Sequence, residues 1–409
     1  MRRVLFTTTL ILWTLPMAAQ GPTWTFGGFG TAGVTQSSTD GAQYLRDLTQ
    51  PLGVDRDPNV KIDSRLGLQA NVALTDTLRA TVQVVSKYRH DKTWTPDLTW
   101  ALLAWSPMPD LQIRGGRLGF DVFMDSDSRD VGYSFLWTRP PVEYFGGLAI
   151  SHFDGIDLAR DFSLATGGSL RLKIYGGLAS EKLPVGGTEP LDLSGSPLLG
   201  VMGEWTRGPW RSRLGYAQFR PRHNMPAPLT QLQDGLRQFA VIDPRLIQAA
   251  DDLNFADRRV RYASAAVAFE QDGLQAQGAL ARFQTDAVTA PDSWSGFASL
   301  GYRVGKVVPF GAFSRISASR PSVNLGLLPL VPSPEAQGLI QGLEIFLNAS
   351  QSARSTWTFG MRWNLADKAC LKVQVDRVQS HNASGLWARP QPGWDGRATL
   401  VTATLDFVF

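Results

Sequence analysis

The last eleven residues, 399–409, alternate between apolar and polar side chains and end on an aromatic residue. Val401, Ala403, Leu405, Phe407 and Phe409 would share one face of an extended strand, because side chains alternate faces with a period of two. An apolar edge strand that stays unpaired promotes aggregation, whereas a closed transmembrane barrel pairs that edge and turns the apolar face towards lipid. The segment favours such a barrel. The alternative is a buried final strand of a soluble sandwich.

The same alternation recurs along the chain. Apolar residues occupy every second position in 66–74 and again in 78–84, and a tight connection at Thr75 and Asp76 lies between them. A period of two indicates strands rather than helices. We therefore expect an all-β fold, a transmembrane antiparallel up-and-down β-barrel of about sixteen strands. The predicted strands are 24–34, 62–74, 77–87, 96–106, 110–118, 148–162, 169–178, 197–206, 209–219, 258–270, 273–284, 294–304, 307–317, 353–363, 369–379 and 397–409.

Short connections alternate with long polar ones, which is typical of outer-membrane barrels. An even number of strands places both termini on the periplasmic side. Two of the long connections, 229–252 and 334–347, have apolar residues at helical spacing. We expect short loop helices there, packed on the barrel rim.

The amino terminus has the features of a secretory signal peptide. Arg2 and Arg3 precede a short apolar stretch, and small residues suited to cleavage follow before position 21. Residues 1–20 are thus expected to be removed, leaving 21–409 as a single transmembrane β-barrel domain in the bacterial outer membrane. No later stretch reaches about 18 uncharged apolar residues, so spanning helices are not expected. One cysteine, Cys370, allows no internal disulfide.

Several classes of function find little support in the sequence. The 40 basic and 36 acidic residues nearly balance, whereas nucleic-acid binders carry a clustered basic excess. The four histidines show no ligand spacing, so no metal site is predicted. The glycine motif of 28–33 matches a dinucleotide fingerprint but lies within a predicted strand, with no helix after it. We expect no cofactor and no catalytic residues. His152 beside Asp154 is the nearest catalytic candidate, and it has no evident nucleophile.

Taken together, the chain resembles the Gram-negative trimeric porins. The resemblance rests on the strand ending at Phe409, on the hairpin of 356–363 and 370–376, and on the loop after the fifth predicted strand. In that family this loop folds into the lumen and narrows it. Here it covers 119–147, and the sequence Pro-Val-Glu-Tyr-Phe-Gly-Gly at 141–147 is similar to the tip of porin constriction loops. Residues 125–130 and 137–141 differ from the best-known members.

The resemblance implies an outer-membrane porin for passive diffusion of small hydrophilic solutes and ions, with a mild anion preference. It also implies a homotrimer, contacts with membrane lipid and lipopolysaccharide, and Phe409 as the assembly signal read by the barrel assembly machinery. The alternatives are a channel of the same fold specific for phosphate or small organic acids, and a barrel enzyme such as a phospholipase. No nucleic-acid partner is expected.

Selectivity in such a channel arises from charged side chains at its narrowest ring. The predicted constriction loop contributes the acids Asp121, Asp125, Asp127, Asp130 and Glu143. Strand alternation directs ten basic residues of the pore wall towards the lumen: Arg65, Arg79, Arg114, Arg171, Lys173, Arg211, Arg213, Arg303, Arg362 and Lys372. A basic wall opposite an acidic loop would create a transverse field. For each single arginine the alternative is a solvated lumen residue without a role in selection.

Aromatic residues near the strand ends are expected to form interfacial girdles. They are Trp24, Trp100, Trp105, Trp205, Trp357, Trp363, Phe407 and Phe409. The alternative, a stacking path for sugars, would need a row of lumen-facing aromatics. Tyr175 and Phe313 alone do not supply one.

Overall fold

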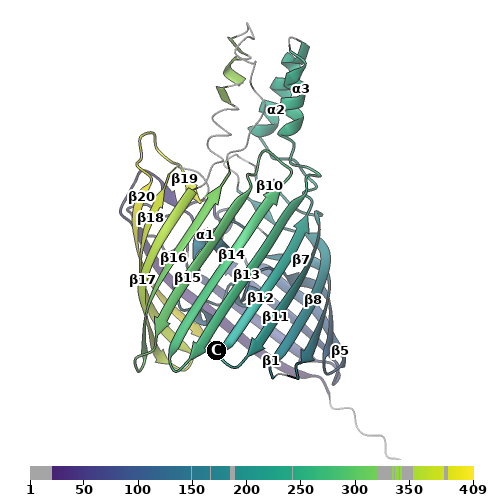
Figure 1. The fold of residues 1–409 in the computed structure, drawn as a ribbon, viewed down its shortest axis with the longest axis vertical. Coiled ribbons are helices and arrows are strands. Elements are labelled where there is room, and N and C mark those ends of the chain that lie inside the picture. Colours follow the sequence, from purple (N-terminus) through teal and green to yellow (C-terminus); the bar gives the residue numbers. More distant parts are fainter. Residues whose placement is uncertain are drawn as a thin grey trace, which may run out of the picture.

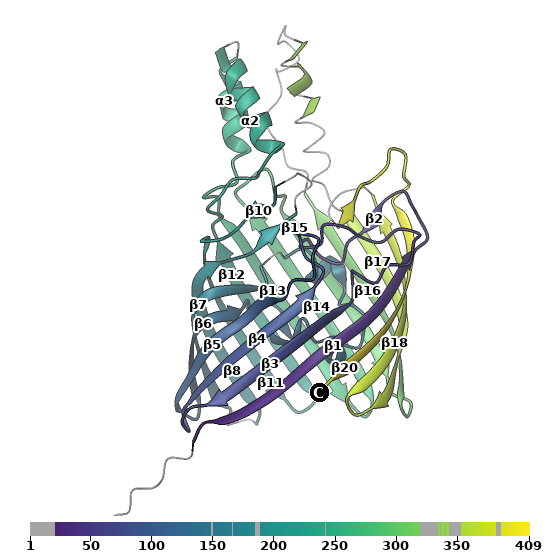
Figure 2. The same ribbon diagram turned by 180° about the vertical axis from the view of Figure 1, so that it is seen from behind.

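Sixteen of the described strands form one closed antiparallel barrel, in which each strand pairs with its neighbours along the chain and the first pairs with the last. The computed structural model describes residues 21–409 except 149, 166, 185–188, 242, 320–333, 336, 340, 343–352 and 382–385. The predicted signal segment 1–20 lies outside the described residues. Figures 1 and 2 show the tilted strands from opposite sides, with the carboxyl terminus at the end of the short turns.

The barrel strands are β1 (Thr23–Ser37), β3 (Arg65–Ala73), β4 (Leu78–Lys87), β5 (Asp97–Met108), β6 (Leu111–Gly119), β7 (His152–Ser163), β8 (Ser169–Ala179), β11 (Pro197–Arg207), β12 (Trp210–Phe219), β13 (Val260–Gln271), β14 (Leu274–Thr285), β15 (Ser293–Tyr302), β16 (Val307–Ala318), β17 (Ala353–Ala366), β18 (Ala369–Ser380) and β20 (Arg397–Val408). The predicted all-β barrel is confirmed, and each predicted strand overlaps one of these, with ends that differ by a few residues.

Short elements lie in the long connections. Two small hairpin sheets pair β2 (Gln43–Tyr44) with β19 (Trp387–Ala388) and β9 (Lys182–Leu183) with β10 (Leu191–Asp192). The helical elements are η1 (Ser126–Ser128), η2 (Gly132–Ser134), α1 (Val142–Phe145), α2 (Leu229–Gln238), η3 (Phe239–Val241) and α3 (Arg245–Asp252). None of the described helices is long and apolar enough to cross a membrane.

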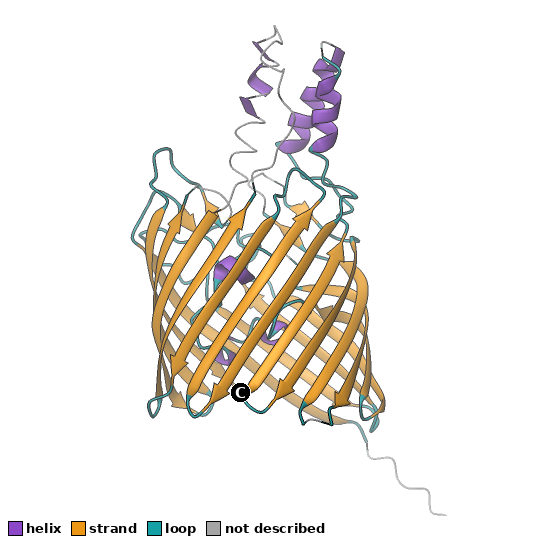
Figure 3. Cartoon of the chain, viewed as in Figure 1, coloured by secondary structure: helices purple, strands orange, loops and turns teal. Residues whose placement is uncertain are grey.

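The helices predicted in 229–252 are present, but they do not lie flat on the rim. Leu236 and Leu246 bury against each other's helices, so α2 and α3 form a hairpin with its own small apolar cluster. Figure 3 shows this hairpin standing away from the barrel at the end opposite the short turns. Half of the second predicted helical segment, 334–347, lies outside the described residues. Its described residues, 334–335, 337–339 and 341–342, are helical.

The outer face of the barrel is apolar and the inner face polar. In β20, the exposed fraction is 51% for Val401 and 40% for Leu405, whereas Thr402, Thr404 and Asp406 are buried inside. This is the arrangement that the terminal alternation predicts. It fits a lipid-facing surface, because each strand presents its apolar side outward while its hydrogen bonds are satisfied within the closed sheet.

Glycines in β1 receive the aromatic rings of the last strand. A Cβ atom on Gly28 would lie 2.3 Å from Cζ of Phe409, and one on Gly30 would lie 2.3 Å from Cζ of Phe407. The Gly28 amide also donates a hydrogen bond to the Phe409 carbonyl, at 3.1 Å. The glycine motif therefore makes room for side chains at the closure of the barrel.

Most of the predicted girdle aromatics lie on the outer face. Trp24, Trp105, Trp357 and Trp363 are each about half exposed there. Trp100 differs, because it packs against the apolar cluster inside the barrel. Phe313 pairs with the exposed Trp357 and therefore faces outward. The girdle assignment of Trp100 and the lumen assignment of Phe313 were wrong.

Candidate functional site

The segment between β6 and β7, residues 120–151, folds back into the barrel. It carries η1, η2 and α1, and α1 packs against β14 to β17 on the far wall. Figure 3 shows these short helices inside the ring of strands. The segment corresponds to the predicted constriction loop 119–147, and we call residues 120–151 the lumen loop.

Aromatic contacts fix the lumen loop against the wall. The ring centroids of Phe123 and Tyr262 are 5.5 Å apart, and Tyr144 and Trp137 lie 5.3 Å and 5.6 Å from Phe297. Such edge-to-face pairs are favourable beyond their area of burial. These contacts were not predicted from the sequence. The inward apolar positions on β14 and β15 were a signal, because they interrupt the polar side of the alternation where the loop packs.

Ion pairs hold the amino-terminal part of the lumen loop. Asp121 bonds to both Lys173 and Arg213, and Asp125 lies 2.6 Å from Arg211. Burial alone would raise the pKa of Asp121, but the two cations outweigh it and hold this pKa below its usual value. Asp121 therefore stays ionised and tethers the loop to the wall.

Asp130 forms a second bridge to the wall. It lies 3.2 Å from Lys87 and 3.5 Å from Arg65. Burial would raise its pKa, and these cations lower it well below the ordinary range. Asp127 differs from its neighbours: it is exposed, and within the described part of the chain it has no ion-pair partner.

The carboxyl-terminal part of the loop is held by Glu143 in α1. Glu143 accepts hydrogen bonds from Arg354 at 2.7 Å and from Ser314 and Thr356 at 2.6 Å each. These donors outweigh burial and lower its pKa. Sequence reasoning missed Arg354, although the alternation of the predicted strand 353–363 places it on the same face as Arg362.

The loop also contributes a cation, Arg139, that pairs with acids outside the loop. Arg139 is 2% exposed and bonds to Asp63 at 2.8 Å, to Asp376 at 3.1 Å and to Thr402 at 2.5 Å. A buried guanidinium with several charge-assisted hydrogen bonds is costly to leave unpaired. No motif around Arg139 indicates this role, because its partners come from distant strands.

Other predicted wall residues have partners of their own. Arg114 bonds to Asp157 at 2.5 Å, Arg171 lies 3.4 Å from Asp161, and Lys372 lies 3.1 Å from Asp406. Arg362 donates to the carbonyl oxygens of Tyr133 and Phe135. Among the described residues, Arg79, Arg303 and Arg362 have no ion-pair partner. The structure thus places all ten predicted cations on the inner side, but most charges meet in pairs instead of facing each other across an opening.

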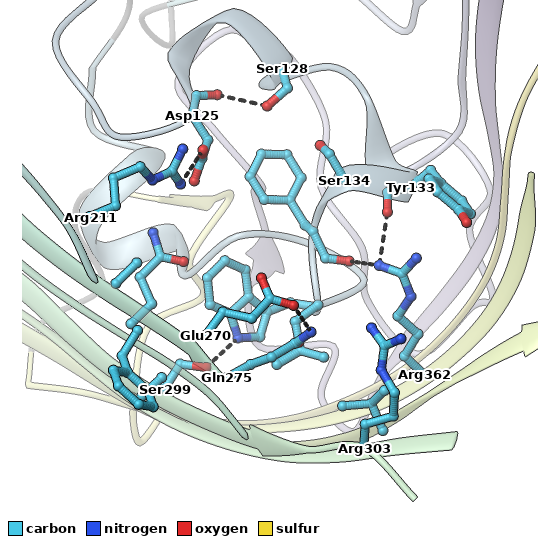
Figure 4. A pocket seen from close by; sticks show the side chains of 18 residues that line it. Asp125, Ser128, Tyr133, Ser134, Arg211, Glu270, Gln275, Ser299, Arg303 and Arg362 are labelled. Carbon is cyan, nitrogen blue, oxygen red and sulfur yellow. Dashed lines mark hydrogen bonds and ion pairs between the residues drawn. The ribbon is translucent and has the colours of Figure 1, made fainter. Parts of the chain in front are cut away.

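Three cavities border the lumen loop. A cavity of 510 Å³ lies towards the short-turn end, between the loop and the wall (Figure 4), and its lining includes Asp125 and Phe135. These two residues also border a narrower space of 90 Å³. That space in turn shares Leu148 with a 210 Å³ cavity on the side of the long loops. The loop therefore borders two larger cavities, one towards each end of the barrel, and a smaller space whose lining overlaps both.

The structure brings Ser151, His152 and Glu181 together at the top of the lumen. Ser151 Oγ lies 2.9 Å from His152 Nδ1, and Glu181 Oε1 lies 3.2 Å from the same nitrogen. In a hydrolytic triad the nucleophile and the acid bind opposite ring nitrogens. Here Ser151 and Glu181 both approach Nδ1, and Ser151 donates to Glu181. The cluster therefore lacks the arrangement of a nucleophile and base.

Comparison with known proteins gives structural likeness only. No protein-family model matches the sequence, and no curated protein matches it. Among solved structures, OmpF of Salmonella typhi in complex with daunomycin has a TM-score of 0.57 at 10% identity, covering 95% of this chain and 98% of that chain. The trimer form of OmpT of Vibrio cholerae has a TM-score of 0.55 at 11% identity, covering 95% of this chain and 100% of that chain.

An anion-selective porin from Comamonas acidovorans has a TM-score of 0.53 at 13% identity, covering 95% of this chain and 100% of that chain. These matches span nearly the whole of each protein. The chain thus has the fold of the sixteen-stranded Gram-negative outer-membrane porins, as the sequence predicted.

Proposed function

We propose that the protein is a channel of the outer membrane that admits small hydrophilic solutes and ions by passive diffusion. The observation that carries this proposal is the lumen loop, which is ion-paired to the wall on several sides and borders a larger cavity towards each end of the barrel. A loop held in this way sets a fixed, narrow and polar passage. Water-filled passages of this kind select by width and by the charge that lines them.

A mild anion preference is part of the proposal. Most loop acids are neutralised by wall cations, whereas Arg79, Arg303 and Arg362 keep positive charge without an ion-pair partner on the inner side of the described residues. Asp127 and Glu270 are exposed acids on the same inner side, and neither has an ion-pair partner among the described residues. The remaining electrostatic field in the lumen favours anions. This preference is weaker than the one that a wall of unneutralised basic residues would give.

A homotrimer embedded in lipid and lipopolysaccharide is the assembly that we propose, supported by the trimer form of OmpT among the structural matches. The barrel assembly machinery would recognise the strand ending at Phe409. Catalysis is not part of the proposal, because the Ser151, His152 and Glu181 cluster has the wrong geometry for it.

Liposome swelling tests the permeation step. Vesicles containing the purified protein should swell in solutions of small sugars, and the rate should fall steeply with solute size because the loop restricts the passage. Swelling no faster than in protein-free vesicles would overturn the proposed function.

A further inference from the structure

Two arginines in the 510 Å³ cavity differ from their neighbours. Arg303 and Arg362 both line this cavity near the short-turn end (Figure 4), and neither has a carboxylate partner in the described ranges. By contrast, Arg211 in the same cavity is neutralised by Asp125 at 2.6 Å. The lining also includes the exposed Glu270, which accepts a hydrogen bond from Gln275 at 3.0 Å. The cavity is therefore lined by three guanidinium groups and two carboxylates, and it keeps a net positive charge.

Arg362 is held in place before any solute arrives. Its Nη1 donates to the carbonyl oxygens of Tyr133 at 2.9 Å and Phe135 at 3.1 Å, and its Nε donates to Asn364 at 2.9 Å. The ring of Tyr133 covers the guanidinium at 4.7 Å. These contacts leave Nη2 without a hydrogen-bond partner among the described residues. A donor that is already positioned loses little entropy when it binds an anion.

The rest of the cavity is suited to an apolar body. Leu136, Trp137 and Val308 border it, and the Trp137 indole is fixed by a 3.0 Å hydrogen bond to Ser299. Pockets that bind small molecules combine apolar walls with a few positioned polar groups. A volume of 510 Å³ lies within the usual range for such pockets.

We propose that this cavity is a binding subsite for small organic acids, with the carboxylate between Arg303 and Arg362 and the apolar part against Leu136, Trp137 and Val308. The proposal rests on the proposed channel function, because it places the subsite on the solute path. Guanidinium groups suit carboxylates through paired hydrogen bonds. The apolar wall favours a carboxylate with a ring or chain over inorganic phosphate.

Calorimetric titration of the detergent-solubilised protein tests the subsite without requiring conduction. Benzoate should bind saturably. Benzamide, which has the same ring without the charge, and inorganic phosphate, which has charge without the ring, should each bind at least about tenfold more weakly. Saturable binding of benzoate with an inactive channel would refute the channel and keep the subsite. Conduction without benzoate binding would refute the subsite and keep the channel.

Arg303→Gln is the informative variant, because Arg303 is exposed and makes no described ion pair that holds the fold. It should weaken benzoate binding about tenfold. Arg79→Gln is the matched control: Arg79 is also exposed, inward and unpaired, but it does not border the cavity. The affinity of the Arg79→Gln variant for benzoate should stay within about twofold of that of the parent protein. Equal binding of benzamide or phosphate, or equal losses in the two variants, would overturn the proposal.

Discussion

The Asp125 carboxylate and the Arg211 guanidinium meet at 2.6 Å, where the lumen loop approaches the wall beside the 510 Å³ cavity. Asp125 is the residue immediately before η1, and Arg211 is the first inward residue of β12, so the pair joins two elements far apart in sequence. The pair is partly exposed, and its effect on stability is therefore small. Its effect on the field in the lumen is larger, because it cancels one positive charge.

Replacing Asp125 with Asn should make the channel more anion-selective. The substitution keeps the size of the side chain and frees the charge of Arg211, which raises the local anion concentration. The zero-current potential in a potassium chloride gradient should shift further towards the chloride potential. Ser128→Ala, at an uncharged position that lines the same cavity, should leave it unchanged. A shift towards cation preference in Asp125→Asn would contradict the placement of this pair.

Loosening the tether at Asp121 should destabilise the loop and widen the passage. Asp121→Asn leaves Lys173 and Arg213, both less than 9% exposed, without their shared carboxylate. Breaking a buried pair in this way costs about 3–5 kcal/mol. We expect a lower thermal midpoint in detergent and a larger, noisier single-channel conductance.

Asp127→Asn is the control for this tether, because Asp127 lies in the same loop but is exposed. Its thermal midpoint should match that of the parent. If both variants lose the same stability, the ion pairs of Asp121 do not hold the loop.

Closure of the barrel should depend on Gly28. A methyl group there would lie 2.3 Å from the Phe409 ring and 2.8 Å from the carbonyl oxygen of Gly67. Gly28→Ala should cost about 1–3 kcal/mol, as overpacking does, and slow the appearance of the heat-modifiable folded band during refolding. Gly115→Ala, where a Cβ would meet nothing within 4 Å, is the matched change. If Gly28→Ala refolds at the rate of Gly115→Ala, the space that Gly28 leaves for the Phe409 ring is not needed for closure of the barrel.

Acid should weaken the top of the barrel through Glu181. Burial would raise its pKa, but His152 and Ser151 lower it to about 2 from an ordinary value of 4.5. Because the pKa is lower in the folded state, the contribution of Glu181 is complete above pH 4.5 and is lost as pH falls from 4.5 to about 2. It amounts to no more than about 3 kcal/mol.

Thermal midpoints measured from pH 7 to pH 3 check this contribution. The thermal midpoint of the parent protein should be constant from pH 7 to pH 4.5 and should decrease at lower pH. The thermal midpoint of Glu181→Gln should be lower at pH 7 and should decrease less. A parallel fall in both proteins would show that Glu181 does not carry the acid sensitivity.

The strand pattern was predictable because lipid imposes it: every second residue must be apolar for a strand to cross. Residues such as Leu405 and Asp406 reveal their faces by their chemistry. The lumen was less predictable, because its contacts join residues far apart in the chain. Nothing local to Arg139 indicates that it reaches Asp63 and Asp376. Likewise, the acids of the loop could be named, but their direct pairing with the wall depends on how deeply the loop folds in.

The proposed function requires a passage that stays open beside the tethered lumen loop. Single-channel recording of the purified protein in a planar bilayer with a salt gradient tests it most directly. We expect discrete conductance steps and a zero-current potential shifted towards the equilibrium potential of the anion. A membrane that contains folded protein and yet carries no steps would contradict the proposed function.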